Sequence, residues 1–276
     1  MTIKFFFQKV WNKLKYPLGY FLFITAIGYG FFNIPADLWN IKPLWLLLAI
    51  INILIIFLCQ LLQVVVFLYA HSLKPDFLYI SLFTLRKGIL NSVMPAKSGT
   101  LILAHMLSNH YQLRWHNFLI FTITGGIASV FVSLLGAVWL FWGLLTLSLV
   151  SFFFLLIVIF LSRIKMIPYA QTLPTQLTIM LIQFLTILIG FFCILHGIGF
   201  NVSFQKSAHF AVVLNLLSQV SITPGNLGIR EIVTGAVASL VELPTSVGIL
   251  AGALFFAIRL IVYTLLLCIF EIWNRC

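Results

Sequence analysis

Charged residues are scarce in this chain, and acidic residues are the scarcest of them. Only 8% of the 276 residues are charged, against roughly 25% in a typical soluble domain, and Asp and Glu together number five. Because 62% of the residues are hydrophobic, the chain is predicted to be an all-α polytopic membrane protein. The shortage of polar segments excludes catalytic machinery in an extramembrane domain. We therefore expect a transporter-like protein and not an enzyme.

The residue patterns of nucleophilic and metal chemistry are also missing. The four cysteines show no disulfide or metal-ligand spacing, and the six histidines show no zinc-ligand spacing with carboxylate support. The sequence contains no Ser-His-Asp arrangement, Walker loop or dinucleotide fingerprint. We therefore expect no cofactor and no metal. Among the histidines, only His105 is kept as a candidate cavity residue.

The net charge of +11 does not indicate a nucleic-acid partner. The cations lie beside apolar segments instead of forming one basic face, which is typical of topology signals and of attraction to anionic lipid headgroups. The expected partner is therefore a membrane lipid with an anionic headgroup. Residues 1–16, which contain four lysines, are predicted to form a basic N-terminus in the cytoplasm.

A membrane span needs about 20 apolar residues, and six segments of this chain are close to that length. These candidate spans are residues 17–35, 43–70, 117–141, 144–161, 173–196 and 245–271. Two further apolar segments, 88–110 and 206–241, contain proline and glycine near their middle. The sequence therefore predicts about six full spans and two broken segments.

The two broken segments carry the same short pattern, S-x-x-P-x-x-x-G. It runs from Ser92 to Gly99 and again from Ser221 to Gly228, an offset of 129 residues. Proline removes a backbone donor and glycine tolerates left-handed backbone, so each copy predicts a helix break. The predicted break residues are Pro95, Gly99, Pro224, Gly225 and Gly228. Each segment is then a re-entrant pair of half-helices, although a kinked span or two short spans would fit the same pattern.

The distribution of Lys and Arg favours the re-entrant alternative. With a cytoplasmic N-terminus and two returning hairpins, eleven cations fall on the cytoplasmic side and two outside. In this topology residues 43–141 and 173–271 are inverted copies of each other, as in transporters whose binding site lies between two repeats. Both termini are predicted to be cytoplasmic, and segments 17–35 and 144–161 lie outside the repeat.

Basic and polar residues near the two breaks form the candidate site. Lys97 lies within the first break, beside a half-helix that starts near Ser98, where amide donors and the helix dipole favour an anion. Alternatively, Lys97 extends toward the membrane interface. Asn215 and Gln219 belong to a polar stripe that either joins helices or lines a headgroup path. The predicted headgroup-binding residues are Lys97, Ser98, His105, Asn215, Gln219, Asn226 and Arg230.

Arg259 lies in the middle of the last span and therefore needs a partner. Glu231 is the carboxylate with a matching depth, because Glu242 and Glu271 lie near the ends of segments. Arg230 and Glu231 are adjacent and point about 100° apart on a helix, so they are not expected to pair with each other. The sequence predicts a structural or gating pair of Glu231 with Arg259, although Glu231 could also cap its own helix.

The stretch from Pro224 to Glu231 resembles the P-G-x-x-G-x-x-E signature of the lysylphosphatidylglycerol synthase transmembrane region family, a group of flippase-like membrane domains. Asn91–Gly99 resembles the P-x-R/K-x-G element of that family, and Arg259 stands about 28 residues after Glu231, as in its terminal span. Thr100 occupies a position where the family often places a carboxylate. The resemblance implies a protein of the bacterial or archaeal cytoplasmic (inner) membrane that moves lipids or lipid-linked sugars. Without the soluble synthase domain of the best-known members, lysyl transfer is not expected.

Together these features predict the translocation of a lipid or lipid-linked sugar with an anionic phosphate headgroup across the membrane. Two alternatives stay open. One is a non-catalytic membrane subunit of a lipid or glycan synthesis or export complex, with biosynthetic proteins as partners. The other is a membrane-embedded polyprenyl-lipid transferase. Such an enzyme would need an acidic metal-binding pair, which Asp76 alone does not supply.

Overall fold

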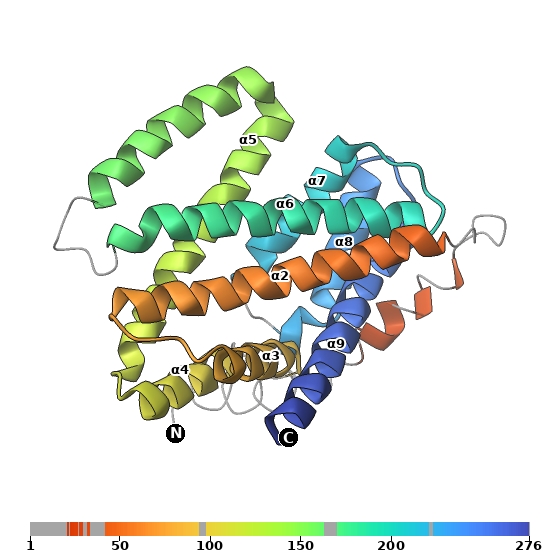
Figure 1. The fold of residues 1–276 in the computed structure, drawn as a ribbon. Coiled ribbons are helices and arrows are strands. Elements are labelled where there is room, and N and C mark those ends of the chain that lie inside the picture. Colours follow the sequence, from red (N-terminus) through yellow and green to blue (C-terminus); the bar gives the residue numbers. More distant parts are fainter. Residues whose placement is uncertain are drawn as a thin grey trace, which may run out of the picture.

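All regular structure in the part of the chain described here is helical (Figure 1). The computed structural model describes residues 42–93, 98–162, 170–220 and 223–275, together with part of the segment 21–33. This confirms the all-α prediction. The basic segment 1–16 and most of the predicted span 17–35 lie outside the described residues.

In the described part of the chain, four segments are long and apolar enough to cross a membrane. They are Pro43–Ala70, Trp115–Leu140, Leu173–Gly197 and Thr245–Asn274, and they belong to helices α2 (Pro43–Ala70), α5 (Trp115–Ser162), α6 (Leu173–Gly197) and α9 (Thr245–Arg275). Proline stands in the first turn of α2 and α6, where a missing N–H removes no intrahelical bond. The remaining predicted span, 144–161, is the second part of α5, and Figure 1 shows that α5 bends sharply and folds back.

Four shorter helices form two contacting pairs, one around each copy of the proline-glycine pattern. The helices are α3 (Phe77–Val93), α4 (Ser98–Tyr111), α7 (Phe204–Leu217) and α8 (Ile229–Leu240). The first pair is interrupted between Val93 and Ser98, and Pro95 lies outside the described residues. In the second pair a short 3₁₀ turn, η3 (Pro224–Asn226), precedes α8. The chain is therefore broken between α7 and α8, where the sequence predicts the second break, whereas the first predicted break falls on residues outside the described ones.

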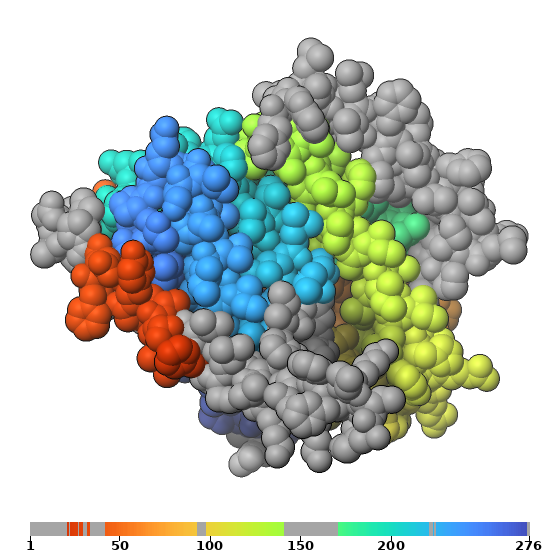
Figure 2. Space-filling view, turned by 180° about the vertical axis from the view of Figure 1, so that it is seen from behind, coloured from red at the N-terminus to blue at the C-terminus, as the bar shows by residue number. Residues whose placement is uncertain are grey.

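The helices of the N-terminal and C-terminal halves interlock. Helices α2 and α6 lie side by side (Figure 1), α3 packs against α9, and α7 packs against α5. Figure 2 shows α7 and α8 beside the first part of α5 on the opposite face of the molecule. The main core joins α6, α7 and α9, where Phe191 stacks on Phe210 and Phe255 with ring centroids 5.4 and 4.9 Å apart. The same core also includes Phe57 of α2 and Val132 of α5, so buried apolar residues from both halves pack into one body.

Two glycines of α9 let this helix pack directly against Thr234 of α8. A Cβ atom added at Gly248 would lie 2.2 Å from the carbonyl oxygen of Thr234, and one added at Gly252 would lie 2.4 Å from the Thr234 hydroxyl. Close contacts of this kind between small residues are typical of helix packing in membranes. The position of α8, and of everything attached to its first turn, therefore depends on these glycines.

We expect Gly248→Ala to destabilise the protein by about 1–3 kcal/mol, because the new methyl group meets backbone and α8 must move away from α9. The measurement is thermal unfolding of the purified protein in detergent. Gly28→Ala is the matched control, since no atom lies within 4 Å of the added Cβ there. Equal melting temperatures for both variants would contradict the close packing of α8 on α9.

Candidate functional site

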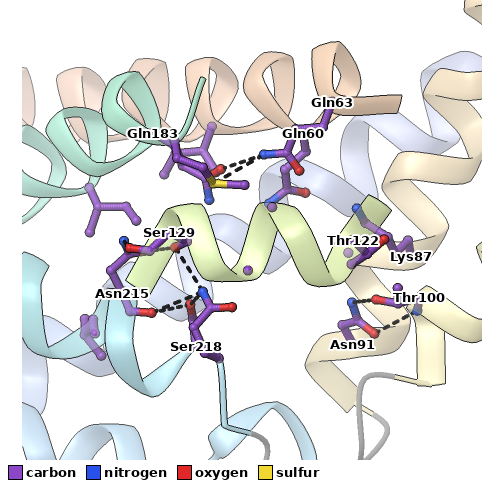
Figure 3. Close-up of a pocket in the computed structure, with 18 of the residues that line it drawn as sticks. Gln60, Gln63, Lys87, Asn91, Thr100, Thr122, Ser129, Gln183, Asn215 and Ser218 are labelled. Carbon is purple, nitrogen blue, oxygen red and sulfur yellow. Dashed lines mark hydrogen bonds between the residues drawn. The ribbon is translucent and has the colours of Figure 1, made fainter. Parts of the chain in front are cut away.

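A cavity of about 290 Å³ lies where the helices of the two halves meet (Figure 3). Helices α2 to α9 all contribute residues to its wall. Its polar and charged lining residues are Gln60, Gln63, Lys87, Asn91, Ser92, Thr100, Thr122, Ser129, Gln176, Gln183, Asn215, Ser218, Gln219, Asn226, Arg230 and Arg259. Since the surrounding helices are predominantly apolar, this concentration of basic and amide side chains marks the cavity as the candidate site.

Three basic residues reach the cavity from three different helices: Lys87 from α3, Arg230 from α8 and Arg259 from α9. Lys87 was not among the predicted binding residues, because it was counted with the cations on the cytoplasmic side. Helix α3 begins at Phe77, so Lys87 lies well inside it. The spacing of Lys87 and Asn91 could have indicated that both belong to the site, because residues four apart share one helix face. Both residues line the cavity.

Glu231 is fully buried, and its partners correct one prediction. Its Oε1 accepts hydrogen bonds from Nε of Arg230 at 3.0 Å and from Nη2 of the same guanidinium, and its Oε2 accepts one from the Gly228 N–H at 2.7 Å. Arg230 and Glu231 therefore pair despite being adjacent. The physical reason is that Gly228, at φ 79°, turns the chain at the start of α8, so Glu231 folds back as a cap while the long arginine side chain reaches it.

Arg259 forms no ion pair with Glu231, so the predicted pair of these two residues is wrong. Its guanidinium lies 5.2 Å from the ring centroid of Tyr263, and its Nε is buried without a hydrogen-bond partner. The guanidinium of Arg230 likewise lies over an aromatic ring, 4.3 Å from the centroid of Phe256. A buried donor without a partner costs free energy, so Arg259 presents a binding capacity that the cavity's own residues leave unused.

The two helix breaks meet beside this cavity. Gly225 has a φ of 57°, and a Cβ there would lie 2.2 Å from the carbonyl oxygen of Ser92 at the end of α3. Within the first pair, the side chain of Asn91 donates to the hydroxyl of Thr100 and accepts from its N–H, both at 3.2 Å. Thr100 therefore joins the start of α4 to the last turn of α3 by neutral hydrogen bonds. Gly99 packs on the same asparagine.

Three of the predicted binding residues line the cavity but are engaged within the protein. Asn226 donates to the carbonyls of Leu217 and Val220 at 2.9 and 2.7 Å, which satisfies the open end of α7. Asn215 donates to the Ser133 hydroxyl at 2.8 Å and accepts from the Ser129 hydroxyl at 3.2 Å, and Gln219 donates to Ser129 at 3.0 Å. These bonds join α7 to α5, which favours the helix-joining interpretation of the polar stripe.

The remaining predicted residues lie elsewhere. His105 contacts Asn109 at 3.3 Å along the exposed side of α4 and does not line the cavity. Ser98 starts α4 with a buried hydroxyl that has no partner, also away from the cavity wall. Lys97 lies outside the described residues. In the described part of the chain, no group of three or more His, Cys, Asp or Glu side chains is placed to hold a metal ion.

An uncharged layer of amides covers the α2 and α6 side of the cavity (Figure 3). Gln63 of α2 donates to the Gln183 carbonyl of α6 at 3.3 Å, and the Tyr263 hydroxyl donates to Gln60 at 3.3 Å. From the sequence, Gln60, Gln63 and Gln183 were expected, like the polar stripe, either to join helices or to line a headgroup path, and they were not among the predicted binding residues. Their signal was weak, because single amides within long apolar helices are also common where helices join.

Residues 165–266 match the family model described as Lysylphosphatidylglycerol synthase TM region. The match covers somewhat more than a third of the chain, includes Arg230, Glu231 and Arg259, and is consistent with the family that the sequence motifs resemble. No curated protein and no solved structure matches the chain. Together with the four long apolar helices, the match indicates a multi-pass membrane protein with a lipid-related role.

We expect Glu231→Gln to destabilise the protein by about 3–5 kcal/mol, because it leaves the buried Arg230 charge without compensation. In the double variant with Arg230→Gln, much of this loss should be recovered, since no buried charge then remains in the pair. Thermal unfolding in detergent measures both effects. Glu242→Gln, which removes an exposed pair with Lys206, is the control and should change little.

The same variants test the corrected pairing. If the pair were Glu231 with Arg259, exchanging their charges would restore stability, whereas we expect that exchange to fail. A double variant of Arg230 and Glu231 no more stable than Glu231→Gln alone would contradict the proposed compensation.

Proposed function

We propose that this protein translocates a lipid or lipid-linked sugar with an anionic phosphate headgroup from one membrane leaflet to the other. The observation that carries this proposal is the cavity lined by Lys87, Arg230 and Arg259 within helices of membrane-spanning length. Charged residues at membrane depth are costly and normally mark the path of a polar or ionic substrate. The lipid-related family match of the C-terminal part supports the same conclusion.

The chemistry of the lining suits a phosphate group. Arginine presents planar, bidentate donors that fit phosphate oxygens, and the unpartnered Nε of Arg259 adds a donor already free of water. Amides such as Gln60 and Gln63 supply further N–H groups that can replace the hydration of a headgroup. The acyl or prenyl chains would stay in the bilayer, because the cavity volume of about 290 Å³ accommodates only a headgroup.

The arrangement of the helices supports a mechanism of alternating access. We propose that residues 43–141 and 173–271 form an inverted repeat, with α3–α4 and α7–α8 as re-entrant hairpins. In support, the contacts of one half recur in the other: α3 packs on α9 as α7 packs on α5, and α2 contacts α9 as α6 contacts α5. Rocking of one repeat against the other would expose the cavity to each leaflet in turn.

In this proposal the protein lies in a bacterial or archaeal cytoplasmic membrane with both termini in the cytoplasm. The three basic lining residues would hold the phosphate, while Glu231 keeps Arg230 in place. Asn215, Gln219 and Asn226 would line the path while fixing α7 to its neighbours. Interaction with proteins of lipid or glycan biosynthesis belongs to the alternative role as a non-catalytic subunit.

The decisive experiment is a leaflet-exchange assay with the purified protein in liposomes. A lipid labelled on its acyl chain with a fluorophore is reduced by dithionite only in the outer leaflet, so the reduced fraction reports exchange. We expect Arg259→Gln to slow exchange at least about tenfold, because losing a charged hydrogen bond costs roughly 1.5–3 kcal/mol. Arg86→Gln, which removes a half-exposed pair with Glu271 on the surface, is the matched control and should keep the rate.

Two results would overturn the proposal. The first is wild-type protein that moves no phospholipid in liposomes although it remains folded. The second is full activity in Arg259→Gln, which would favour the subunit alternative, in which the cavity has no transport role.

A further inference from the structure

The glutamines of α2 and α6 at the cavity wall (Figure 3) indicate what lies beside the phosphate. Resting on the proposed function, in which Arg259 contacts the phosphate, we propose that the preferred headgroup carries hydroxyl groups next to that phosphate, as a polyol or a sugar does. Gln60, Gln63 and Gln183 bind these hydroxyls and thereby determine which headgroup is carried. The inference comes from the hydrogen-bonding capacity that the three amides leave unused.

Each of the three amides engages only one of its two polar atoms with described residues. Gln60 accepts a hydrogen bond from the Tyr263 hydroxyl at 3.3 Å through Oε1, and its Nε2 has no partner among the described residues. Gln63 donates through Nε2 to Oε1 of Gln183 at 3.3 Å and to the sulfur of Met180 at 3.7 Å, which leaves its Oε1 unpaired in the same part of the chain. Within these bounds Nε2 of Gln183 is unpaired as well. The three side chains therefore offer both donors and an acceptor to whatever fills the cavity.

These unused groups belong to helices of membrane-spanning length, where an unpaired amide is costly. Gln60 is only 9% exposed, and its helix α2 is strongly apolar. A buried polar group without a hydrogen bond costs free energy, so the amides need a polar partner inside the cavity. A headgroup that supplies this partner is favoured over one that displaces water from the amides without replacing its hydrogen bonds.

Hydroxyl groups complement these amides better than other parts of a headgroup do. An amide presents a donor and an acceptor side by side, and a hydroxyl both donates and accepts. An ionised phosphate oxygen only accepts, so it leaves the free carbonyl of Gln63 unpaired. An ammonium group only donates, so it leaves the N–H groups of Gln60 and Gln183 unpaired. An alkyl group pairs with neither, and the amides therefore select a hydroxylated neighbour of the phosphate.

Tyr263 places these amides next to Arg259. The Tyr263 ring centroid lies 5.2 Å from Cζ of Arg259, and the hydroxyl at the other end of the ring donates to Gln60. A phosphate at Arg259 and a group at Gln60 are therefore separated by about the length of one side chain. Gln63 follows three residues after Gln60 and shares its helix face. A polyol or sugar attached to the phosphate extends along this row of amides.

The cavity has room beside the glutamines. Gly125 of α5 lines it, and a Cβ atom added there would stand 3.4 Å from both Cε of Met180 and Oε1 of Gln176 on α6. Met180 in turn contacts the Gln63 amide. Because Gly125 has no side chain, the wall opposite this part of α6 leaves space for the neutral part of a headgroup.

The test compares acyl-labelled lipids with identical chains in the leaflet-exchange assay with wild-type protein. Phosphatidylglycerol and phosphatidylpropanol carry the same charge and the same carbon skeleton in the headgroup, and they differ only in hydroxyl groups. Each is a trace component of phosphatidylcholine liposomes, so its initial rate compares kcat/KM. We expect phosphatidylglycerol to exchange at least about fivefold faster, because each neutral hydrogen bond lost lowers the rate by roughly two- to tenfold. Phosphatidylinositol faster than phosphatidylglycerol indicates a sugar-like ring as the preferred hydroxylated part, and the reverse order indicates an open polyol.

Glutamine variants supply a second measurement. Gln60→Met and Gln183→Met keep the length of the side chain but remove the amide, so the ratio of the phosphatidylglycerol rate to the phosphatidylpropanol rate should fall toward one. A purely structural role of these glutamines would slow both lipids alike and keep the ratio. Gln205→Met, which removes an exposed amide at the start of α7 away from the cavity wall, is the control and should keep the wild-type ratio.

Two outcomes would overturn the inference while leaving the proposed function intact. They are equal exchange of phosphatidylglycerol and phosphatidylpropanol by wild-type protein, and a rate ratio unchanged in both Gln60→Met and Gln183→Met. A folded protein that moves none of the three labelled lipids would instead overturn the proposed function itself.

Discussion

A membrane interior forces every charge and every open helix end to find its partner within the protein, and Glu231 meets both demands at once. One of its oxygens accepts the N–H of Gly228 at the start of α8, and the other accepts two donors of Arg230. Helix α8 packs closely on α9 at Gly248 and Gly252. The ion pair with Glu231 therefore holds the Arg230 guanidinium over Phe256 at the cavity wall. The binding capacity of the cavity thus depends on a carboxylate that is itself inaccessible.

The same constraint explains the amides around the two breaks. Asn226 satisfies carbonyls that the end of α7 leaves open, and Asn91 closes the first pair of half-helices through Thr100. Asn215 binds serines of α5 across the boundary between the two halves. Neutral hydrogen bonds therefore carry much of the architecture around the breaks.

The long apolar helices and the second helix break followed from the sequence, because hydropathy and the backbone chemistry of Pro and Gly act locally. The partner of Glu231 did not, since it depends on the left-handed turn at Gly228, which lets adjacent side chains converge. Lys87 was misplaced because its helix begins earlier than the apolar run suggests. His105 could not be assigned to a helix face without knowing how α4 packs, and it lies on the exposed side.

A Cβ atom added at Gly225 would lie 2.2 Å from the carbonyl oxygen of Ser92, so main chain packs directly on main chain where the second break meets the end of α3. A contact between side chains can open by a rotamer change within nanoseconds. A contact between main-chain atoms separates only when whole segments of chain shift together. Collective motions of that kind take microseconds to milliseconds. In the proposed mechanism of alternating access, a motion that separates this contact would therefore be slower than any side-chain rearrangement.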